Sequence, residues 1–349
     1  MTMGDESEGH RRAFLAHLTT DLCDADEARL IAEHTRSCPT CAYAEAERRE
    51  VDDLLLALGD VDELPDAPSP AQLRAAARAR RRPAPRVPAF AAPFAAAAGI
   101  LESVLAEVSD DALRTPSPVL TWRVGDLVPH LAAGNALLAT AIGVAVEPAP
   151  GPVAGLVSHT ERLLSWVAGW PRERVQALWR RGVEAIAARL STQPELASLR
   201  VEVDGVRTTV ADQLKIRAFE TWTHARDIGA AAGLRVPPPP ADSLGAMADL
   251  AARLLSTLPP RAATAPAGAV RLTLTGPGGG SWLVQIGGAG AAAAAAAVGL
   301  PEAELTLDTV EFCLLVADRG QPTEPHTEIF GDDALAAELL AIAPQLAGP

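Results

Sequence analysis

The sequence is poor in lysine. A single lysine, Lys215, stands among 30 basic residues, so arginine carries nearly all of the positive charge. Acidic residues outnumber basic ones by 44 to 30, and the net charge at pH 7 is −14. Nucleic acids and anionic membrane surfaces are themselves negatively charged, so this balance disfavours both as direct partners. We therefore expect no direct nucleic-acid binding and no membrane binding.

The sequence also lacks an apolar run long enough to span a bilayer without interruption. The stretch AFAAPFAAAAGILESVLAEV comes closest, and its proline and glutamates favour a buried helix instead. The start, MTMGDESEGHRR, is polar and acidic and does not resemble a signal peptide. Only four cysteines are present, and their clustering fits a reducing compartment better than a disulfide framework. The predicted location is the cytoplasm.

Apolar spacing and loop-forming residues predict a mainly α protein in four segments. Residues 1–57 form a small helical module, and residues 58–89 form a basic helix, AQLRAAARARRR, with a Pro-rich linker. Residues 90–235 are predicted to be helical throughout. Residues 236–349 form a small α/β domain, in which the Gly-rich turn GPGGGS joins two strands. A third strand follows at AELTLD, with helices over 309–318 and 333–346.

The first cluster of chemically active residues is HTRSCPTC. A Cys-x2-Cys turn offers two thiolates, Cys38 and Cys41, to one tetrahedral zinc ion, and His34 lies one helical turn earlier. The fourth ligand would come from upstream: His10 is preferred, Cys23 is second, and His17 is also available. The alternative is that the two cysteines are incidental.

The stretch LIAEHTRSCPTCAYAEAE, within residues 8–50, resembles the zinc-binding anti-sigma factor domain. That family commonly has a cysteine about two dozen residues before the histidine, where this chain has Glu8 and His10. The resemblance implies zinc at the N-terminal module and a sigma factor as partner. The basic helix in the 58–89 segment would supply the additional helix that clamps the sigma factor, or it is a solvated part of the linker.

A second cluster lies in FETWTHARDIGAAAGL. Glu220 and His224 are four residues apart, so they share one helix face and could give two ligands to one metal. Asp227 follows three residues after the histidine and could orient the imidazole. An ordinary polar helix face is the alternative, because two ligands alone do not make a site.

The segments TPSPVLTWRVGDLVPHLAAGNALL and FETWTHARDI resemble the N-terminal domain of mycothiol-dependent maleylpyruvate isomerases, which are DinB-like four-helix metalloproteins. Trp122, Asp126 and His130 fit the first family block, and the Glu220 to Asp227 stretch fits the second. The resemblance extends over 90–235 and, more weakly, to 349. It implies that His130, Glu220 and His224 hold a divalent metal, with zinc the expected ion and mycothiol the thiol.

Two departures from that family bear on the site. Pro129 stands directly before His130, and a helix beginning near Val124 would place this proline beyond its first turn, so we expect a kink. Arg319, in ADRG, is a weak candidate for holding an anionic group.

Several other residues are expected to be structural. His159 and His326 have no neighbouring ligand types and are predicted to lie at the surface. Cys313 is on the apolar face of VEFCLLV and is predicted to be in the core. Three tryptophans are expected to be core anchors around a helix break at Pro171: Trp166, Trp170 and Trp179.

These observations support two functions. The favoured one is a zinc-binding anti-sigma-type transcription regulator, whose metal-binding bundle senses or handles a small thiol or an electrophile. The alternative is a mycothiol-dependent metalloenzyme, an isomerase or thiol S-transferase, in which the zinc finger is structural. The order of module, basic helix and tether favours the regulator. Retention of three metal ligands with a C-terminal domain favours the enzyme.

Overall fold

The structure is a computed structural model, and it describes residues 84–149, 151, 155–262, 264–287, 301–320 and 327–347, with four residues before them. Those four are helical, as the pattern ADEARLIAEHTRS predicts: Arg29, Glu33, His34 and Arg36. Contacts between Cα atoms divide the chain into two units, Met1–Ala75 and Ala76–Pro349. All elements given below belong to the second unit.

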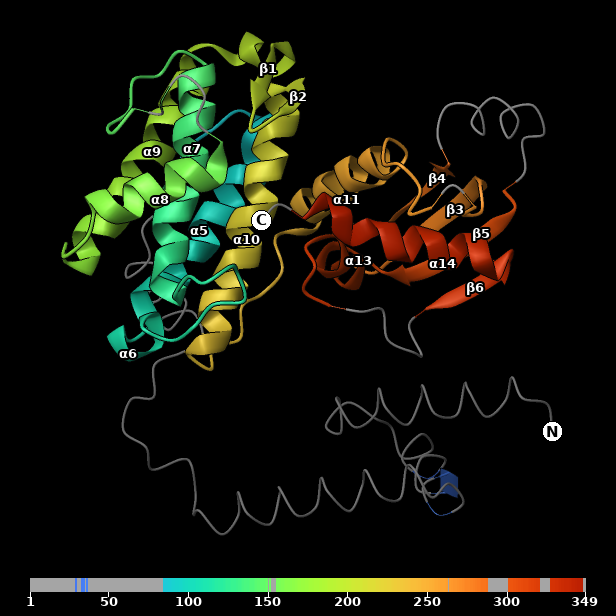
Figure 1. Cartoon of the computed structure of the whole chain (residues 1–349). Helices are drawn as coiled ribbons and strands as arrows, with labels where there is room; N and C mark the ends of the chain where they lie inside the picture. Colours follow the sequence, from blue (N-terminus) through green and yellow to red (C-terminus); the bar gives the residue numbers. More distant parts are fainter. Residues whose placement is uncertain are drawn as a thin grey trace. The chain divides into compact units, whose positions relative to one another are not determined.

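The predicted bundle is built from five long or medium helices (Figure 1): α5 (Ala92–Glu107), α7 (Leu127–Ala141), α8 (Leu156–Trp166), α9 (Arg172–Thr192) and α10 (Val210–Ala231). Helix α5 packs along α10, and α7 packs against α8, α9 and α10. Short elements connect them: η2 (Ala89–Ala91), α6 (Asp110–Leu113), η3 (Val124–Asp126) and η4 (Pro194–Ser198). The mainly helical prediction for this segment is confirmed.

The starts of α7 and α10 follow from their capping residues. The backbone N–H of Arg123 donates to the Asp126 carboxylate at 2.8 Å, which fixes the turn η3 just before α7. The Thr209 hydroxyl accepts from the backbone N–H of Asp212 at 3.2 Å and begins α10. Because α7 begins at Leu127, Pro129 is its third residue, where no intrahelical N–H bond is lost. The reason for expecting a kink at Pro129 therefore disappears.

A short hairpin interrupts the segment that was expected to be wholly helical. Strands β1 (Arg200–Val203) and β2 (Val206–Thr209) pair antiparallel across a two-residue turn, Asp204–Gly205. Both turn residues have positive φ, +50° and +76°, as a type I′ turn requires. The signal for it, Asp-Gly between alternating residues, is present in RVEVDGVRTT. The Asp204 carboxylate also accepts from the backbone N–H of Leu156 at 2.8 Å, which ties the hairpin to α8.

The predicted α/β segment forms a four-stranded sheet with the order β4-β3-β5-β6. Its strands are β3 (Gly268–Thr275), β4 (Gly280–Ile286), β5 (Ala303–Asp308) and β6 (Glu328–Gly331). Strand β3 pairs antiparallel with β4 and parallel with β5, in the register Leu272↔Trp282 and Leu272↔Leu305. The helices are α11 (Ala241–Leu255), α13 (Thr309–Val316) and α14 (Asp333–Ile342), followed by η5 (Ala343–Leu346) (Figure 1). The three expected strands and both expected helices are confirmed.

The Gly-rich turn between β3 and β4 has a packing reason. Gly278 has φ +78°, and a Cβ there would lie 2.6 Å from the Gly245 nitrogen of α11. The turn can approach this helix only without a side chain, so the glycines serve packing and not phosphate binding.

Two large hydrophobic cores form, one in the bundle and one around the sheet, and a smaller third cluster lies between α7, α8 and α9. Helices α5 and α10 contribute to both, because Ala97, Ala218 and Trp222 belong to the sheet core. Among the described residues, Ala89–Glu107 is long and apolar enough to cross a membrane, and half of its apolar window is buried inside the protein. The prediction of a buried helix for this stretch is confirmed by its packing against α10.

Candidate metal centre

Three side chains predicted as metal ligands meet between α7 and α10. His130 lies in the first half of α7, and Glu220 and His224 lie one turn apart on α10. His130 Nε2 is 4.0 Å from Glu220 Oε2, and the two imidazole rings are 5.1 Å apart between centroids at an angle of 78°. The ring of Trp122 packs on the other side of His130, 5.0 Å between centroids. Residues about 90 positions apart in the chain thus converge on one point.

The hydrogen bonds of His130 fix which nitrogen carries its proton. Thr160 on α8 donates its only hydroxyl proton to the carbonyl of Leu156, at 2.8 Å. The same oxygen lies 3.2 Å from His130 Nδ1, so it can only accept, and Nδ1 must donate. His130 Nε2 is therefore the nitrogen with the lone pair, and this buried atom has no hydrogen-bond partner within the described part of the chain. A histidine ligand needs this tautomer.

His224 is oriented by a carboxylate. Asp227 Oδ2 lies 3.0 Å from His224 Nδ1, which leaves Nε2 as the ligand nitrogen. Arg319, just after α13, donates from Nε to Asp227 Oδ1 at 3.0 Å and from Nη2 to Oδ2 at 3.3 Å. Its Nη1 donates to the carbonyls of Ala317 and Asp318. Arg319 thus supports the histidine through Asp227, which differs from the anion-holding role expected from the sequence.

Glu220 divides its two oxygens between different neighbours. Oε1 accepts from Arg217 Nη2 at 2.5 Å, whereas the buried Oε2 faces His130 with no hydrogen-bond partner among the described residues. Arg217 is only 4% exposed. Its guanidinium fits because Gly134 of α7 has no side chain: a Cβ there would lie 1.9 Å from Arg217 Nη1. The Arg217–Glu220 pair therefore fixes the carboxylate with one oxygen available.

The electrostatics of the site favour neutral imidazole and ionised carboxylate. Burial, His224 and Arg217 lower the pKa of His130 from 6.5 to about 2, so this ring is neutral at physiological pH. Burial alone would raise the pKa of Asp227, but hydrogen bonds from His224 and Arg319 outweigh it and hold this pKa below its ordinary value. A neutral imidazole is the form in which His130 can bind a metal, and an ionised Asp227 is the form that accepts from His224.

The three side chains fit a divalent metal in chemistry, and the distance between two of their donor atoms is close to what a metal requires. Ligand atoms about 2.0–2.1 Å from a tetrahedral zinc lie roughly 3.3 Å from each other. His130 Nε2 and Glu220 Oε2, at 4.0 Å, are slightly further apart. Correspondingly, no group of three or more His, Cys, Asp and Glu side chains in the described ranges is already arranged to hold a metal. The orphaned lone pairs of His130 and Glu220 are the feature that points to an ion.

A cavity of about 390 Å³ opens beside this cluster. Arg217, Glu220 and His224 form one side of it, and residues of the hairpin, α11, the end of α13 and η5 form the rest. Apolar side chains make up much of the wall, among them Phe219, Leu250, Leu254, Leu258 and Val316. A small molecule bound there would have direct access to the cluster.

Other predicted site residues are placed as follows. Among the residues predicted to bind the N-terminal zinc, the structure describes only His34, which is helical. The others lie outside the described residues: His10, Cys23, Cys38 and Cys41. His326 also lies outside them. The prediction that His159 lies at the surface is wrong. Its side chain is on the buried face of α8 and is 1% exposed. Cys313 is in the core, as predicted, and burial raises the pKa of its thiol.

Sequence reasoning missed Thr160 and Arg217, which orient two of the three ligands. Arg217 carried a signal, because it is three residues before Glu220 and thus on the same helix face. Thr160 carried none, since its contact with His130 joins two helices 30 positions apart.

Comparison with known proteins supports the bundle prediction. Residues 94–229 match the family model of the mycothiol maleylpyruvate isomerase N-terminal domain. Crystal structures of the mycothiol-dependent maleylpyruvate isomerase and of its histidine-to-alanine mutant are similar to this chain. The isomerase is 15% identical, with a TM-score of 0.46, covering 70% of this chain and 92% of that chain. The mutant is 14% identical, with a TM-score of 0.45, covering 68% and 95%. No curated protein matches the chain significantly.

Proposed function

We propose that this protein is a metal-dependent enzyme that uses a small thiol of the mycothiol type, as an isomerase or thiol S-transferase. The observation that carries the proposal is the pair of buried, unpartnered lone pairs on His130 Nε2 and Glu220 Oε2, 4.0 Å apart. The family match over residues 94–229 supports it, because that segment contains all three proposed ligands.

His130, Glu220 and His224 would hold the metal, and three protein ligands leave a fourth position open for a reactant. A divalent metal held by these residues would lower the pKa of a bound thiol and so supply a thiolate at neutral pH. A thiolate can add to an electrophilic alkene and leave after bond rotation, which isomerises the double bond without net change of atoms. It can also displace a leaving group and remain on the product.

The remaining residues of the site act by position and charge. Thr160 keeps the lone pair of His130 directed at the centre, and Asp227 does the same for His224. Arg217 neutralises part of the Glu220 charge, so that a substrate with electron-rich groups meets less repulsion. The apolar part of the cavity wall would pack against the substrate beside the reacting atoms.

The anti-sigma regulator predicted from the N-terminal segment is the less supported reading. The residues that carry it, around Cys38 and Cys41, lie outside the described part of the chain. The family match falls on the bundle and bears on thiol chemistry. A sigma-factor partner and an N-terminal zinc therefore stay predictions from the sequence.

The first test is metal content of the full chain by mass spectrometry, after loading with zinc and removal of excess ion. His130→Ala and Glu220→Gln are expected to lose one equivalent of metal. His159→Ala is the matched control, because it removes another buried histidine whose Nε2 has no partner within the described residues. Equal metal content in wild type, His130→Ala and His159→Ala would contradict the proposed site.

The second test is thiol chemistry with the loaded protein. Wild type is expected to accelerate isomerisation of, or thiol addition to, an electrophilic alkenoic acid when mycothiol is supplied, and His130→Ala is expected to be inactive. If wild type binds metal at these residues but shows no thiol-dependent turnover, the site stands and the enzyme assignment fails. The bundle would then be read as a sensor.

A further inference from the structure

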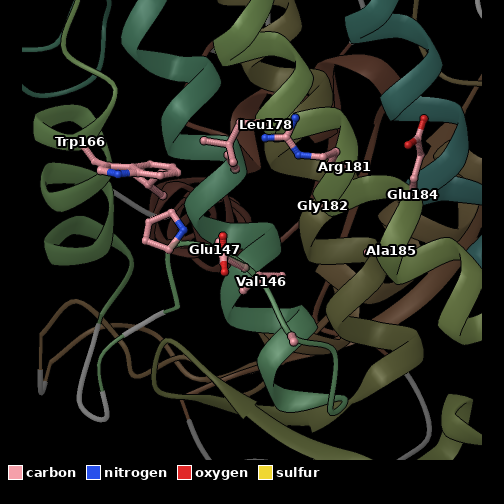
Figure 2. A pocket seen from close by; sticks show the side chains of 13 residues that line it. Val146, Glu147, Trp166, Leu178, Arg181, Gly182, Glu184 and Ala185 are labelled. Carbon is pink, nitrogen blue, oxygen red and sulfur yellow. The ribbon is translucent and has the colours of Figure 1, made fainter. Parts of the chain in front are cut away.

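A second cavity opens at the surface of the bundle, and none of the three proposed metal ligands lines it. Figure 2 shows the side chains that form its wall. Its volume is about 560 Å³, within the range of small-molecule sites. Its walls come from α7, α8, α9 and the loop after α7. The apolar lining consists of small or aliphatic residues with one aromatic ring: Ala132, Ala136, Ala145, Val146, Pro148, Leu163, Leu178, Gly182, Ala185 and Trp166.

This cavity is on the opposite side of α7 from the metal cluster. Ala132 and Ala136 line it, whereas His130 and Gly134 face the cluster and Arg217. Positions two residues apart on an α-helix differ by about 200°, so these two pairs point in opposite directions. The cavity exists because α7 has alanines on this face and α9 has Gly182 across from them.

Arginine side chains fix the loop that forms the open wall. At its start, Arg189 Nε of α9 donates to the carbonyl of Ile142 at 3.2 Å. At its end, Arg162 Nη2 of α8 donates to the carbonyl of Ala149 at 2.6 Å. The loop residues Val146, Glu147 and Pro148 are thus held between two anchored ends. The cavity is a built feature of the bundle.

Charges of both signs are placed in this apolar wall. Arg181, Glu147 and Glu184 line the cavity (Figure 2). Arg181 has no ion pair or hydrogen bond among the described residues, and neither has Glu147. Glu184 is near Arg180, whose pKa it helps to raise. Trp166, although large and apolar, is 43% exposed beside them. Arg181 and Glu147 are exposed and form no ion pair with a described residue, so both charges stay available to a ligand beside the exposed indole.

We propose that this cavity binds an apolar amino acid or a similar zwitterion. Its carboxylate would pair with Arg181 and its ammonium with Glu147, while its apolar side chain would pack on Trp166, Leu163 and Leu178. A simple carboxylate would leave Glu147 without a partner, and a simple amine would leave Arg181 without one, whereas Glu184 already lies near Arg180. A zwitterion satisfies both charges, and its side chain covers the exposed indole face.

The test is calorimetric titration of the full chain with L-phenylalanine, and with 3-phenylpropionate and phenethylamine, which each lack one charge. We expect one phenylalanine per chain and weaker binding of both analogues by roughly 10- to 100-fold, the effect of one charged hydrogen bond. Arg181→Gln and Glu147→Gln are each expected to weaken phenylalanine binding similarly. Both residues are exposed, so neither change threatens folding.

Two further variants locate the ligand. Ala136→Leu fills the cavity from α7 and is expected to abolish binding, whereas Ala188→Leu, on an exposed position of α9 that does not line the cavity, is expected to leave it unchanged. Absence of phenylalanine binding, or equal affinity for the three probes, would overturn the proposal. So would binding that survives both Arg181→Gln and Ala136→Leu. Metal content is not a readout here, so the outcome is independent of the proposed function.

Discussion

Arg319 and Asp227 are 92 positions apart, and they form a two-pronged ion pair, with Nε to Oδ1 at 3.0 Å and Nη2 to Oδ2 at 3.3 Å. The arginine follows helix α13 of the sheet region, whereas the aspartate is on the bundle helix α10. Asp227 in turn accepts from His224. The orientation of a proposed metal ligand thus depends on a residue from the other end of the fold.

Removing this support is expected to weaken metal binding without removing a ligand. For Arg319→Gln, the metal affinity is predicted to fall by up to roughly 10-fold, at the low end of the 10- to 100-fold effect of losing the direct partner of a ligating histidine, because Asp227 itself remains. Competition with a chromogenic chelator measures it. Arg253→Gln breaks two exposed ion pairs of α11, one with Asp249 on the same helix and one with Asp212 on α10, and is expected to have no effect. An unchanged affinity in both variants would contradict the positioning role.

Thr160 is expected to control the tautomer of His130. In Thr160→Val the shape is kept but the Nδ1–H loses its acceptor, so the free energy of unfolding should fall by about 1–3 kcal/mol. Nitrogen NMR of labelled histidine should show the Nδ1–H form in wild type and a mixture in the variant. Thr140→Val removes a similar hydroxyl, bonded to the carbonyl of Ala136, from an exposed position. That control should change stability by under about 0.5 kcal/mol.

The low pKa of His130 predicts a pH-dependent stability in the metal-free protein. The ring is neutral when folded, with a pKa of about 2, but titrates near 6.5 when unfolded. The stability from neutral His130 is therefore complete above pH 6.5 and is lost as the pH falls toward about 2. Between pH 6 and 4.5, the contribution of His130 to the change of unfolding free energy with pH approaches about 1.4 kcal/mol per pH unit. Urea unfolding at a series of pH values should show that the unfolding free energy of His130→Gln lacks this pH dependence. If the unfolding free energies of wild type and variant change in parallel with pH, His130 is not the residue responsible.

Gly134 is expected to tolerate no side chain. In Gly134→Ala the new Cβ would lie 1.9 Å from Arg217 Nη1, and moving the buried guanidinium disturbs its pair with Glu220. We predict a loss of about 1–3 kcal/mol in unfolding free energy. Gly182→Ala is the matched control: its Cβ would lie 3.6 Å from that of Asn135, an ordinary contact. Helix propensity should then make Gly182→Ala neutral or stabilising by up to about 1 kcal/mol. Equal thermal stability of the two variants would contradict this packing argument.

The N-terminal zinc prediction can be tested on the same chain. If His34, Cys38 and Cys41 bind zinc, the wild type should hold two metal equivalents and Cys38→Ser one, with the bundle site intact. Metal analysis of Cys38→Ser combined with His130→Ala should then give none. Two equivalents in Cys38→Ser would show that this cysteine is not a ligand.

Much of the fold could be predicted from the sequence, because it depends on local patterns. The β3–β4 hairpin, strand β5 and helices α13 and α14 follow from alternation and helical spacing, and Glu220 and His224 share a face by simple periodicity. His130 could be joined to them only through the family resemblance. Its distance from Glu220 is a property of how α7 packs on α10.

The misses share a physical cause. The N–H of Arg123 bonds to Asp126 and so determines where α7 begins. The sequence does not show this bond, and it therefore predicts a kink at Pro129. His159 was placed at the surface because nothing local shows which face of α8 is covered. Arg319 was assigned to an anion because its partner, Asp227, is distant in sequence. The last two errors concern contacts between elements and the first concerns a local capping bond, and apolar periodicity encodes neither kind.

The reach of Arg319 into the bundle has a consequence for how such a protein can change. A chain shortened after α10 would keep every proposed ligand and still lose the clamp on Asp227. Substitutions near α13 could therefore adjust metal affinity gradually, while the ligand set itself stays untouched. The segment around α13 would thus set the strength of metal binding, and mutation or laboratory selection could change that strength without removing a metal ligand.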